Sequence, residues 1–142
     1  MVLSVFVYGT LKPGEVNYPR YCAGKVLEQQ AAFTWGELYD LILGYPGMTA
    51  GEEKVQGTLL KFADDSPLSQ LDQLEGYHPH RPAAENEYQR YQVPVYDLQA
   101  NPLGEAWAYF MSLERIKKYQ GQKIASGWWG RKREESASDR IF

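Results

Sequence analysis

The strongest constraint on the fold is an apolar run from Val2 to Tyr8 that stops abruptly at Gly9. The run is rich in β-branched and aromatic side chains, which is typical of a strand buried on both faces. A glycine directly after such a strand allows a sharp turn, and Pro13-Gly14 interrupts the chain again four residues later. We therefore expect a core strand followed by an anchored loop whose free backbone N–H groups suit an anion or a carbonyl oxygen. The alternative is that these residues only shape a turn.

The length and charge of the chain limit its class. A chain of 142 residues is long enough for one domain with a proper core and too short for two. We expect this domain to span residues 1–130 and the polar segment 131–142 to be a flexible tail. The net charge of −3, with both signs spread along the chain, does not predict nucleic-acid binding. Without a readable signal peptide or membrane-spanning run, we expect a cytoplasmic protein with no membrane partner.

The sequence offers few residues for metal or nucleophilic chemistry. Cys22 is the single cysteine, so an internal disulfide is excluded and a cysteine zinc site is disfavoured; we expect the thiol to be inert. His78 and His80, with Glu85 and Glu87, could act as metal ligands, but no regular element holds this segment in geometry. A Ser-His-Asp triad stays open on composition, although there is no Gly-x-Ser-x-Gly sequence. The sequence therefore predicts neither a metal nor a cofactor.

Strand patterns dominate the rest of the chain. They lie over residues 31–41, 55–62, 87–98 and 103–111. The first bends at Gly36, a turn cluster follows at 44–47, and residues 99–102 form a hairpin turn between the last two. Three strands before any convincing helix favour a meander or barrel over a βαβ architecture. Other helical pieces are expected to be short, within 17–24 and after Leu113.

One helix is well marked, with Ser66 as its N-cap, Pro67 in its first turn and Gly76 just past its end. At about 100° per residue, Glu75 falls between Leu68 and Leu71 on the apolar face. Partial burial and the negative end of the helix dipole should both raise the pKa of this carboxyl. Glu75 is therefore a candidate general acid and base, unless fraying of the helix end turns it to water.

Asp72 lies at the edge of the same helix face. We expect it to be solvated or to join a polar network at the helix end.

Three motifs in this order resemble the gamma-glutamylcyclotransferase-like family, and the likeness is closest to its gamma-glutamylamine cyclotransferase branch. The motifs are Tyr8-Gly9-Thr10-Leu11, Leu71-Asp72-x-x-Glu75-Gly76 and Tyr88-x-Arg90. The likeness runs from about Val5 to about Tyr109. It includes the segments Trp35-Gly36-Glu37-Leu38-Tyr39-Asp40 and Val55-Gln56-Gly57-Thr58-Leu59.

The resemblance implies an α+β fold, a small mixed β-barrel with short flanking helices, in which the loop and Glu75 face one cavity. It implies a metal-independent reaction in which the α-amine of a γ-glutamyl amide attacks the γ-carbonyl, giving 5-oxoproline and a free amine. By the same resemblance Glu75 would move the protons, and Arg90 would shape the site or balance charge. The implied substrate-binding residues are Tyr8, Gly9, Thr10, Leu11, Tyr88 and Tyr109.

Other interpretations stay open from the sequence. The same barrel could be a non-catalytic domain that binds a γ-glutamyl compound or a carboxylate. The tryptophans Trp128 and Trp129, with the basic residues 131–133, could form a platform for nucleic acid, although the acidic balance opposes this. Residues 77–87 form a longer spacer than the family resemblance implies, and we expect this segment to be a rim or lid that selects the leaving amine. The sequence does not specify the substrate or the oligomeric state.

Overall fold

The computed structural model describes residues 2–130, and the expected tail 131–142 lies outside this range. Its elements are β1 (Leu3–Val7), α1 (Tyr18–Tyr21), β2 (Val26–Asp40), β3 (Pro46–Phe62), α2 (Leu68–Leu74), the 3₁₀ turn η1 (Ala83–Glu85), β4 (Gln89–Tyr96), β5 (Pro102–Phe110), α3 (Leu113–Lys118) and β6 (Gln122–Lys123). No helix among these is long and apolar enough to cross a membrane.

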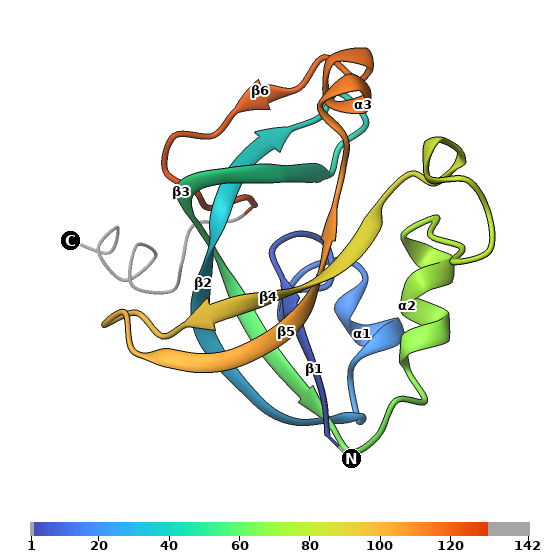
Figure 1. The fold of residues 1–142 in the computed structure, drawn as a ribbon. Coiled ribbons are helices and arrows are strands. Elements are labelled where there is room, and N and C mark those ends of the chain that lie inside the picture. Colours follow the sequence, from blue (N-terminus) through green and yellow to red (C-terminus); the bar gives the residue numbers. More distant parts are fainter. Residues whose placement is uncertain (1, 131–142) are drawn as a thin grey trace.

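The strands form one strongly curved sheet (Figure 1) in the order β3-β1-β5-β4-β2-β6. β1 is antiparallel to β3 and parallel to β5, and β2 also pairs with β3 along most of its length. The curl brings β4 against β2, where one residue pair, Phe33 and Tyr96, joins them. The predicted α+β class is confirmed. The expected mixed β-barrel is more accurately a strongly curved sheet, because so short a pairing does not make a strict barrel.

β1 is the central strand of the core, as its apolar run predicts. Its side chains alternate between two buried clusters, with Val5 and Val7 in one and Phe6 in the other. The first cluster also packs against the leucines of α2, and the second against β2, β3 and β5. β1 is covered on both faces and Tyr8 is still buried, so the chain after β1 first becomes partly exposed at Gly9 and Thr10, which places this loop at the edge of the packed interior.

β2 and β3 are longer than the sequence patterns suggest. The turn expected at 44–47 is wrong in its second half, because β3 already begins at Pro46. Gly47 belongs to the strand, and close packing accounts for the glycine, since a Cβ at this position would lie 2.8 Å from the Cδ1 atom of Ile116. The expected bend at Gly36 coincides with a register shift between Gly36 and Glu37 in the pairing with β3.

α2 forms close to the predicted helix but begins later than expected. Pro67 rather than Ser66 is at the N-cap, and no side chain caps the first turn. The Ser66 N–H instead donates to the Asp64 carboxylate at 2.9 Å, so the serine belongs to the preceding turn. The helix ends at Leu74, with Glu75 at the C-cap and Gly76 in the left-handed region at φ 66°. Glu75 therefore lies where the helix stops and the chain turns back toward the sheet.

Candidate active site

A cavity of about 270 Å³ opens where the loop after β1 meets the end of α2. Its lining residues come from segments that are far apart in the sequence: Phe6, Val7, Tyr8, Gly9, Thr10, Leu11, Asn17, Tyr45, Pro46, Leu74, Glu75, Gly76, Glu87, Tyr88 and Tyr109. The structure thus brings together all seven residues that the sequence analysis selects as catalytic or substrate-binding. Arg90 does not line the cavity and lies behind it.

The backbone of the loop is held by its carbonyl groups. The Lys12 ammonium donates to the carbonyl oxygens of Tyr8 at 3.2 Å and Gly9 at 3.4 Å. The Gly9 oxygen also accepts the Lys12 N–H at 3.1 Å, and the Thr10 oxygen accepts the Asn17 N–H at 2.9 Å. In a trans peptide the N–H of the next residue points away from the carbonyl. The three N–H groups after these carbonyls therefore point away from Lys12 and Asn17.

Those N–H groups belong to Gly9, Thr10 and Leu11, and all three residues line the cavity. None of the three donates a hydrogen bond to residues 2–130. Backbone donors of this kind are seldom left without a partner inside a protein. They form a row of neutral donors that suits a carboxylate or a developing oxyanion.

Gly9 is required here by close packing rather than by an unusual backbone angle. A Cβ at this position would lie 2.8 Å from the Pro46 Cγ atom and 3.0 Å from its Cδ atom. The sequence analysis attributes this glycine to a turn, but the tertiary contact with the start of β3 gives the stronger reason. Only a residue without a side chain therefore lets the loop lie this close to Pro46, on the opposite wall of the cavity.

Glu75 carries the raised pKa that its position on the helix predicts. Burial is the main cause, the charges of Glu87 and Asp72 add to it, and together they raise the pKa of Glu75 to about 8. The backbone N–H of Glu75 donates to the Leu71 oxygen at 3.0 Å, so the residue stays in the last helical turn rather than fraying into water. A carboxyl group with this pKa is partly ionised near neutral pH and can both accept and donate a proton.

Glu87 is a second carboxylate on the cavity that the sequence analysis does not assign to this site. Tyr45 donates its hydroxyl to Glu87, and the pKa of Tyr45 is raised chiefly by burial and further by this hydrogen bond and the Glu87 charge. The Glu87 N–H donates to the Gly76 oxygen at 3.0 Å, which ties the residue to the end of α2. The sequence analysis considers Glu87 only as a possible metal ligand. No sequence pattern near Glu87 indicates that residues 77–87 fold back onto the helix.

A buried polar network fixes α2 against the sheet behind the cavity. The Arg90 guanidinium binds both oxygens of Asp72, at 2.8 and 3.2 Å, and the Tyr109 hydroxyl donates to Asp72 at 2.6 Å. The Tyr8 hydroxyl then donates to the Tyr109 carbonyl at 2.7 Å. The expectation of a solvated Asp72 is wrong, since it is only 9% exposed; its alternative, a polar network at the helix, describes the residue better. Arg90 balances the charge of Asp72, as the resemblance suggests.

The cavity tyrosines are engaged with protein acceptors. Tyr88 donates its hydroxyl to the Pro46 oxygen at 2.6 Å, and Tyr109 donates to Asp72. Burial raises the pKa of Tyr8, Tyr88 and Tyr109 well above the ordinary value, and the charge of Glu75 contributes in each case. These tyrosines are therefore neutral at physiological pH and act as a rigid wall, so that Glu75 and Glu87 are the ionisable carboxyls on the cavity.

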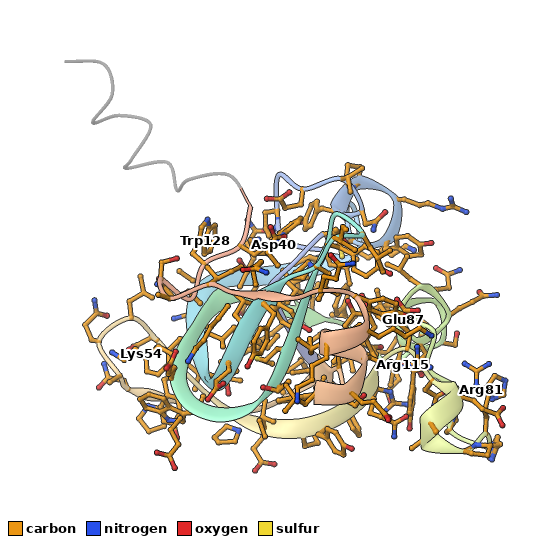
Figure 2. All side chains as sticks on the ribbon, turned by 90° about the horizontal axis from the view of Figure 1, so that it is seen from above. Asp40, Lys54, Arg81, Glu87, Arg115 and Trp128 are labelled. Carbon is orange, nitrogen blue, oxygen red and sulfur yellow. The ribbon has the colours of Figure 1, made fainter. Side chains whose placement is uncertain are left out.

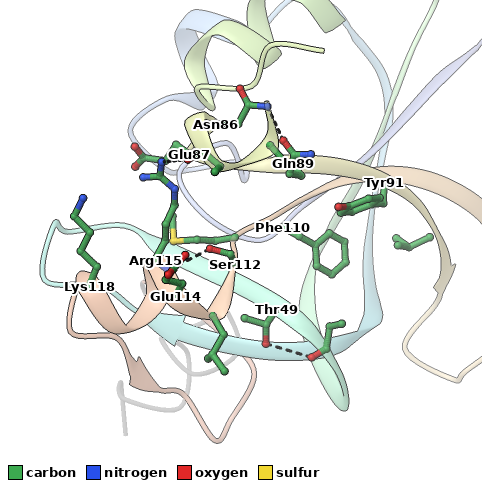
Figure 3. Close-up of a pocket in the computed structure, with 16 residues that line it drawn as sticks. Thr49, Asn86, Glu87, Gln89, Tyr91, Phe110, Ser112, Glu114, Arg115 and Lys118 are labelled. Carbon is green, nitrogen blue, oxygen red and sulfur yellow. Dashed lines mark hydrogen bonds between the residues drawn. The ribbon is translucent and has the colours of Figure 1, made fainter. Parts of the chain in front are cut away.

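A larger groove of about 850 Å³ lies beside the cavity, between η1, β4, β5 and α3 (Figure 3). Glu87 lines both spaces. Figures 2 and 3 show Glu87 close to Arg115, whose guanidinium donates to the Ala84 oxygen at 3.0 Å. The groove has an aromatic floor of Tyr91, which is 51% exposed, and Phe110, with ring centroids 5.7 Å apart.

The residues considered for other chemistry are placed elsewhere. Within residues 2–130, no three or more His, Cys, Asp or Glu side chains lie close enough together to hold a metal ion, and this includes His78 and His80. Cys22 is buried, and burial raises the pKa of its thiol to about 11, which disfavours a nucleophilic thiolate. Trp128 and Trp129 contact the Lys12 ammonium, with ring centroids at 4.5 and 5.1 Å. The basic residues 131–133 of the possible nucleic-acid platform lie outside the described part of the chain.

The fold and this cavity define a class of proteins, and sequence comparison identifies it. The chain belongs to the family described as gamma-glutamyl cyclotransferase, AIG2-like, whose model matches residues 5–131. The family resemblance found in the motifs is thus confirmed, and it places the chain in a class of enzymes.

Individual relatives agree with this assignment. The chain is 36% identical over 126 residues to a protein of Vibrio cholerae whose name provisionally designates it a gamma-glutamylcyclotransferase; the match covers 88% of this chain and 93% of that protein. It is 29% identical over 106 residues to the Niallia circulans enzyme named gamma-L-glutamyl-butirosin B gamma-glutamyl cyclotransferase, covering 75% and 66% of the two chains. A crystal structure of an AIG2-like protein from Mus musculus shares the fold, with a TM-score of 0.65, 20% identity and coverage of 95% and 92%.

Proposed function

We propose that the protein is a cyclotransferase that cleaves a γ-glutamyl amide by intramolecular attack of the substrate α-amine. The observation that carries this proposal is one cavity with two features. Three backbone N–H groups, in Gly9, Thr10 and Leu11, have no acceptor within residues 2–130, and the carboxyl of Glu75 has a pKa of about 8. The N–H groups suit the glutamyl half of the substrate, and the carboxyl suits proton transfer at its amine. The membership of the cyclotransferase family supports the same reaction.

The proposed reaction needs only the substrate and these groups. Glu75 accepts a proton from the α-ammonium, and the freed nitrogen forms a bond to the γ-carbonyl carbon. The bond from that carbon to the departing nitrogen then breaks, which closes the ring of 5-oxoproline. The attacking nitrogen loses two protons in total, and both reach the departing nitrogen, which leaves as an ammonium ion. Glu75 carries protons between the two nitrogens, while Tyr8, Tyr88 and Tyr109 form the wall against which the glutamyl half is held.

The reaction is tested by incubating the protein with γ-glutamyl amines, γ-glutamyl dipeptides and glutathione while 5-oxoproline and the free amine are measured. We expect the two products in equal amounts from at least one of these classes. Binding of 5-oxoproline without turnover of any compound would instead favour the alternative, a non-catalytic binding domain. Absence of both binding and turnover would contradict the two functions together.

The groove next to the cavity is our candidate for the site of the departing amine. Because Glu87 borders both spaces, an amide held with its glutamyl half at the loop can extend past Glu87 into the groove. The segment 77–87 forms part of the groove wall and is braced from within, since the Asn86 side chain accepts from the His78 N–H at 3.0 Å and from the Arg81 guanidinium at 2.7 Å. We therefore propose that this segment is a fixed rim that selects the amine.

Tyr91→Ala should reduce kcat/KM for substrates with bulky apolar amines by roughly 5- to 30-fold, because about 1–2 kcal/mol of aromatic burial is lost. The smallest γ-glutamyl amides should be affected less than about twofold, since they do not reach the aromatic floor. Leu98→Ala is the matched control, because Leu98 is 45% exposed and does not line the groove. Equal losses for large and small amines would place the departing group elsewhere.

Catalysis should not depend on a metal ion, because the proposed proton transfers use only Glu75 and the substrate nitrogens. We expect the rate of 5-oxoproline formation to stay within about twofold after dialysis against a chelator. Loss of turnover that zinc or manganese restores would contradict this prediction.

A further inference from the structure

Lys12 is a buried lysine that the proposed reaction does not use. Burial lowers the pKa of its ammonium to about 8, so the charged form predominates at pH 7 and below, where its ligand binding is to be measured. Lys12 is 1% exposed, and its ammonium donates to the carbonyl oxygens of Trp129 at 2.7 Å, Tyr8 at 3.2 Å and Gly9 at 3.4 Å. Among residues 2–130, the nearest carboxylate oxygen belongs to Glu15 and is 3.8 Å away. A lysine is seldom buried to this extent unless its donors are satisfied, and three carbonyl oxygens match its three N–H groups.

Two of these carbonyls belong to the peptide groups that carry the cavity donors. The carbonyl of Tyr8 is in the same peptide group as the N–H of Gly9, and the carbonyl of Gly9 is in the same group as the N–H of Thr10. By holding both oxygens, Lys12 sets the direction of both N–H groups. A positive charge next to a carbonyl oxygen also polarises the peptide group and strengthens its N–H as a donor.

The end of the described chain keeps this charge away from water. Trp129 contributes its carbonyl oxygen and its ring, whose centroid lies 5.1 Å from the Lys12 ammonium, and Trp128 adds a second ring at 4.5 Å. Trp129 is itself anchored by its indole N–H, which donates to Asp40 at 3.0 Å. Because the cation is covered, its field is screened less than that of an exposed lysine.

We propose that Lys12 is a positioning residue that makes the loop selective for an anionic ligand group, a carboxylate, over a neutral group of the same shape. The proposal rests on the proposed function in that the loop is taken as the site of the glutamyl half. Lys12 acts through the peptide groups of Tyr8 and Gly9 and through its charge behind them. The segment Trp128–Gly130 supports this role of Lys12, since it covers the ammonium group.

The proposal is tested with a pair of ligands that differ in charge: 5-oxoproline, and 2-pyrrolidinone, the same ring without the carboxylate. Lys12→Met should weaken binding of 5-oxoproline by roughly 10- to 100-fold, the range for loss of a charge-assisted interaction. Binding of 2-pyrrolidinone should change less than about threefold. Lys12→Arg should restore most of the affinity for 5-oxoproline, and Lys25→Met, at an exposed lysine, is the matched control.

In turnover, the loss in Lys12→Met should appear mainly as an increase in KM with kcat within about threefold, because the carboxylate is bound equally in ground and transition states. Should the Met variant fail to fold, Lys12→Gln keeps hydrogen bonding without charge. The parent protein supplies an independent measurement: 5-oxoproline should shift the amide resonances of Gly9, Thr10 and Leu11 and the ammonium resonance of Lys12, and 2-pyrrolidinone should not shift the ammonium.

The proposal is overturned if Lys12→Met weakens both ligands equally, if it binds 5-oxoproline as the parent does, or if the parent does not bind 5-oxoproline. These outcomes are separable from the fate of the proposed reaction. Lys12-dependent binding of 5-oxoproline without turnover of any γ-glutamyl compound would uphold the role of Lys12 and reject the catalytic function. Turnover of a γ-glutamyl compound, together with equal weakening of both ligands in Lys12→Met, would uphold the catalytic function and reject the role of Lys12.

Discussion

Glu75→Gln should lower kcat for 5-oxoproline formation by roughly 10² to 10⁴, the usual effect of losing a positioned acid and base. Glutamine keeps the shape of the side chain but cannot take a proton from the α-ammonium or return one to the departing amine. Substrate binding should survive within a few-fold, because the N–H groups of Gly9, Thr10 and Leu11 do not depend on this carboxyl. If the variant retained more than about half of the parental kcat, the proton transfer would have to be assigned to Glu87, the other carboxylate on the cavity.

The parent rate should rise with pH through about 8, because Glu75 must lose its proton to act as the base. Glu87→Gln provides a second measurement of the same effect. The charge of Glu87 contributes to the raised pKa of Glu75, so its removal should move the midpoint of the pH profile to lower pH. A profile whose midpoint is unchanged in Glu87→Gln would mean that the two carboxyls do not interact.

The same pKa shift affects stability with a defined sign. The folded protein raises the pKa of Glu75 from 4.5 to about 8, so the folded state holds the proton more tightly than the unfolded chain. The associated stability is complete below pH 4.5 and is lost as the pH rises through about 8. At about 1.4 kcal/mol per pKa unit, the loss is on the order of 3–5 kcal/mol. Glu75→Gln lacks this titration. As the pH rises from 4.5 to about 8, the free energy of unfolding of the variant should therefore increase relative to that of the parent, as measured by denaturant titrations at several pH values.

Asp72→Ala should lower the free energy of unfolding by roughly 3–5 kcal/mol, the cost of leaving one partner of a buried ion pair without the other. Arg90 would lose its two hydrogen bonds to the carboxylate, and the buried Tyr109 hydroxyl would lose its acceptor. The Arg90 guanidinium lies 4.3 Å from the Trp107 ring centroid and is mostly shielded from water, so solvent cannot easily replace the lost bonds.

Glu53→Ala is the matched control for this variant. It removes an ion pair with Lys123 of similar length, 2.7 Å, whose two side chains are 49% and 42% exposed. Exposed pairs contribute little, so we expect a change below about 1 kcal/mol. Denaturant unfolding of both variants with unchanged m values is the measurement. Equal, small effects at the two sites would show that the Asp72 network does not fix α2, and Glu75 would then need another explanation for its position.

Local sequence patterns were sufficient to predict the buried strand β1, the position of Glu75 on α2 and the family. The nearly continuous apolar run of β1, broken only by Ser4, indicates burial on both faces, because apolar side chains on either face must avoid water, and the run ends where the loop begins. The leucine spacing of α2 places Glu75 toward the apolar side of the helix, since the helical period is set by backbone geometry alone. The order of three short motifs was enough for the family. These features depend on residues within a few positions of one another.

Tertiary structure alone decided the rest. The first half of β3 includes Gly51-Glu52-Glu53-Lys54, which has no apolar alternation. Glu53 and Lys54 pair with Gly36 and Trp35 of β2, and Gly51 and Glu52 fall at the register shift that follows. Glu87 and Tyr45 meet at the cavity although they are 42 residues apart, and Trp129 covers Lys12 across 117 residues. A polar side chain in sequence does not reveal whether it will be buried, because the partner that satisfies it comes from a distant segment that only the curl of the sheet brings near.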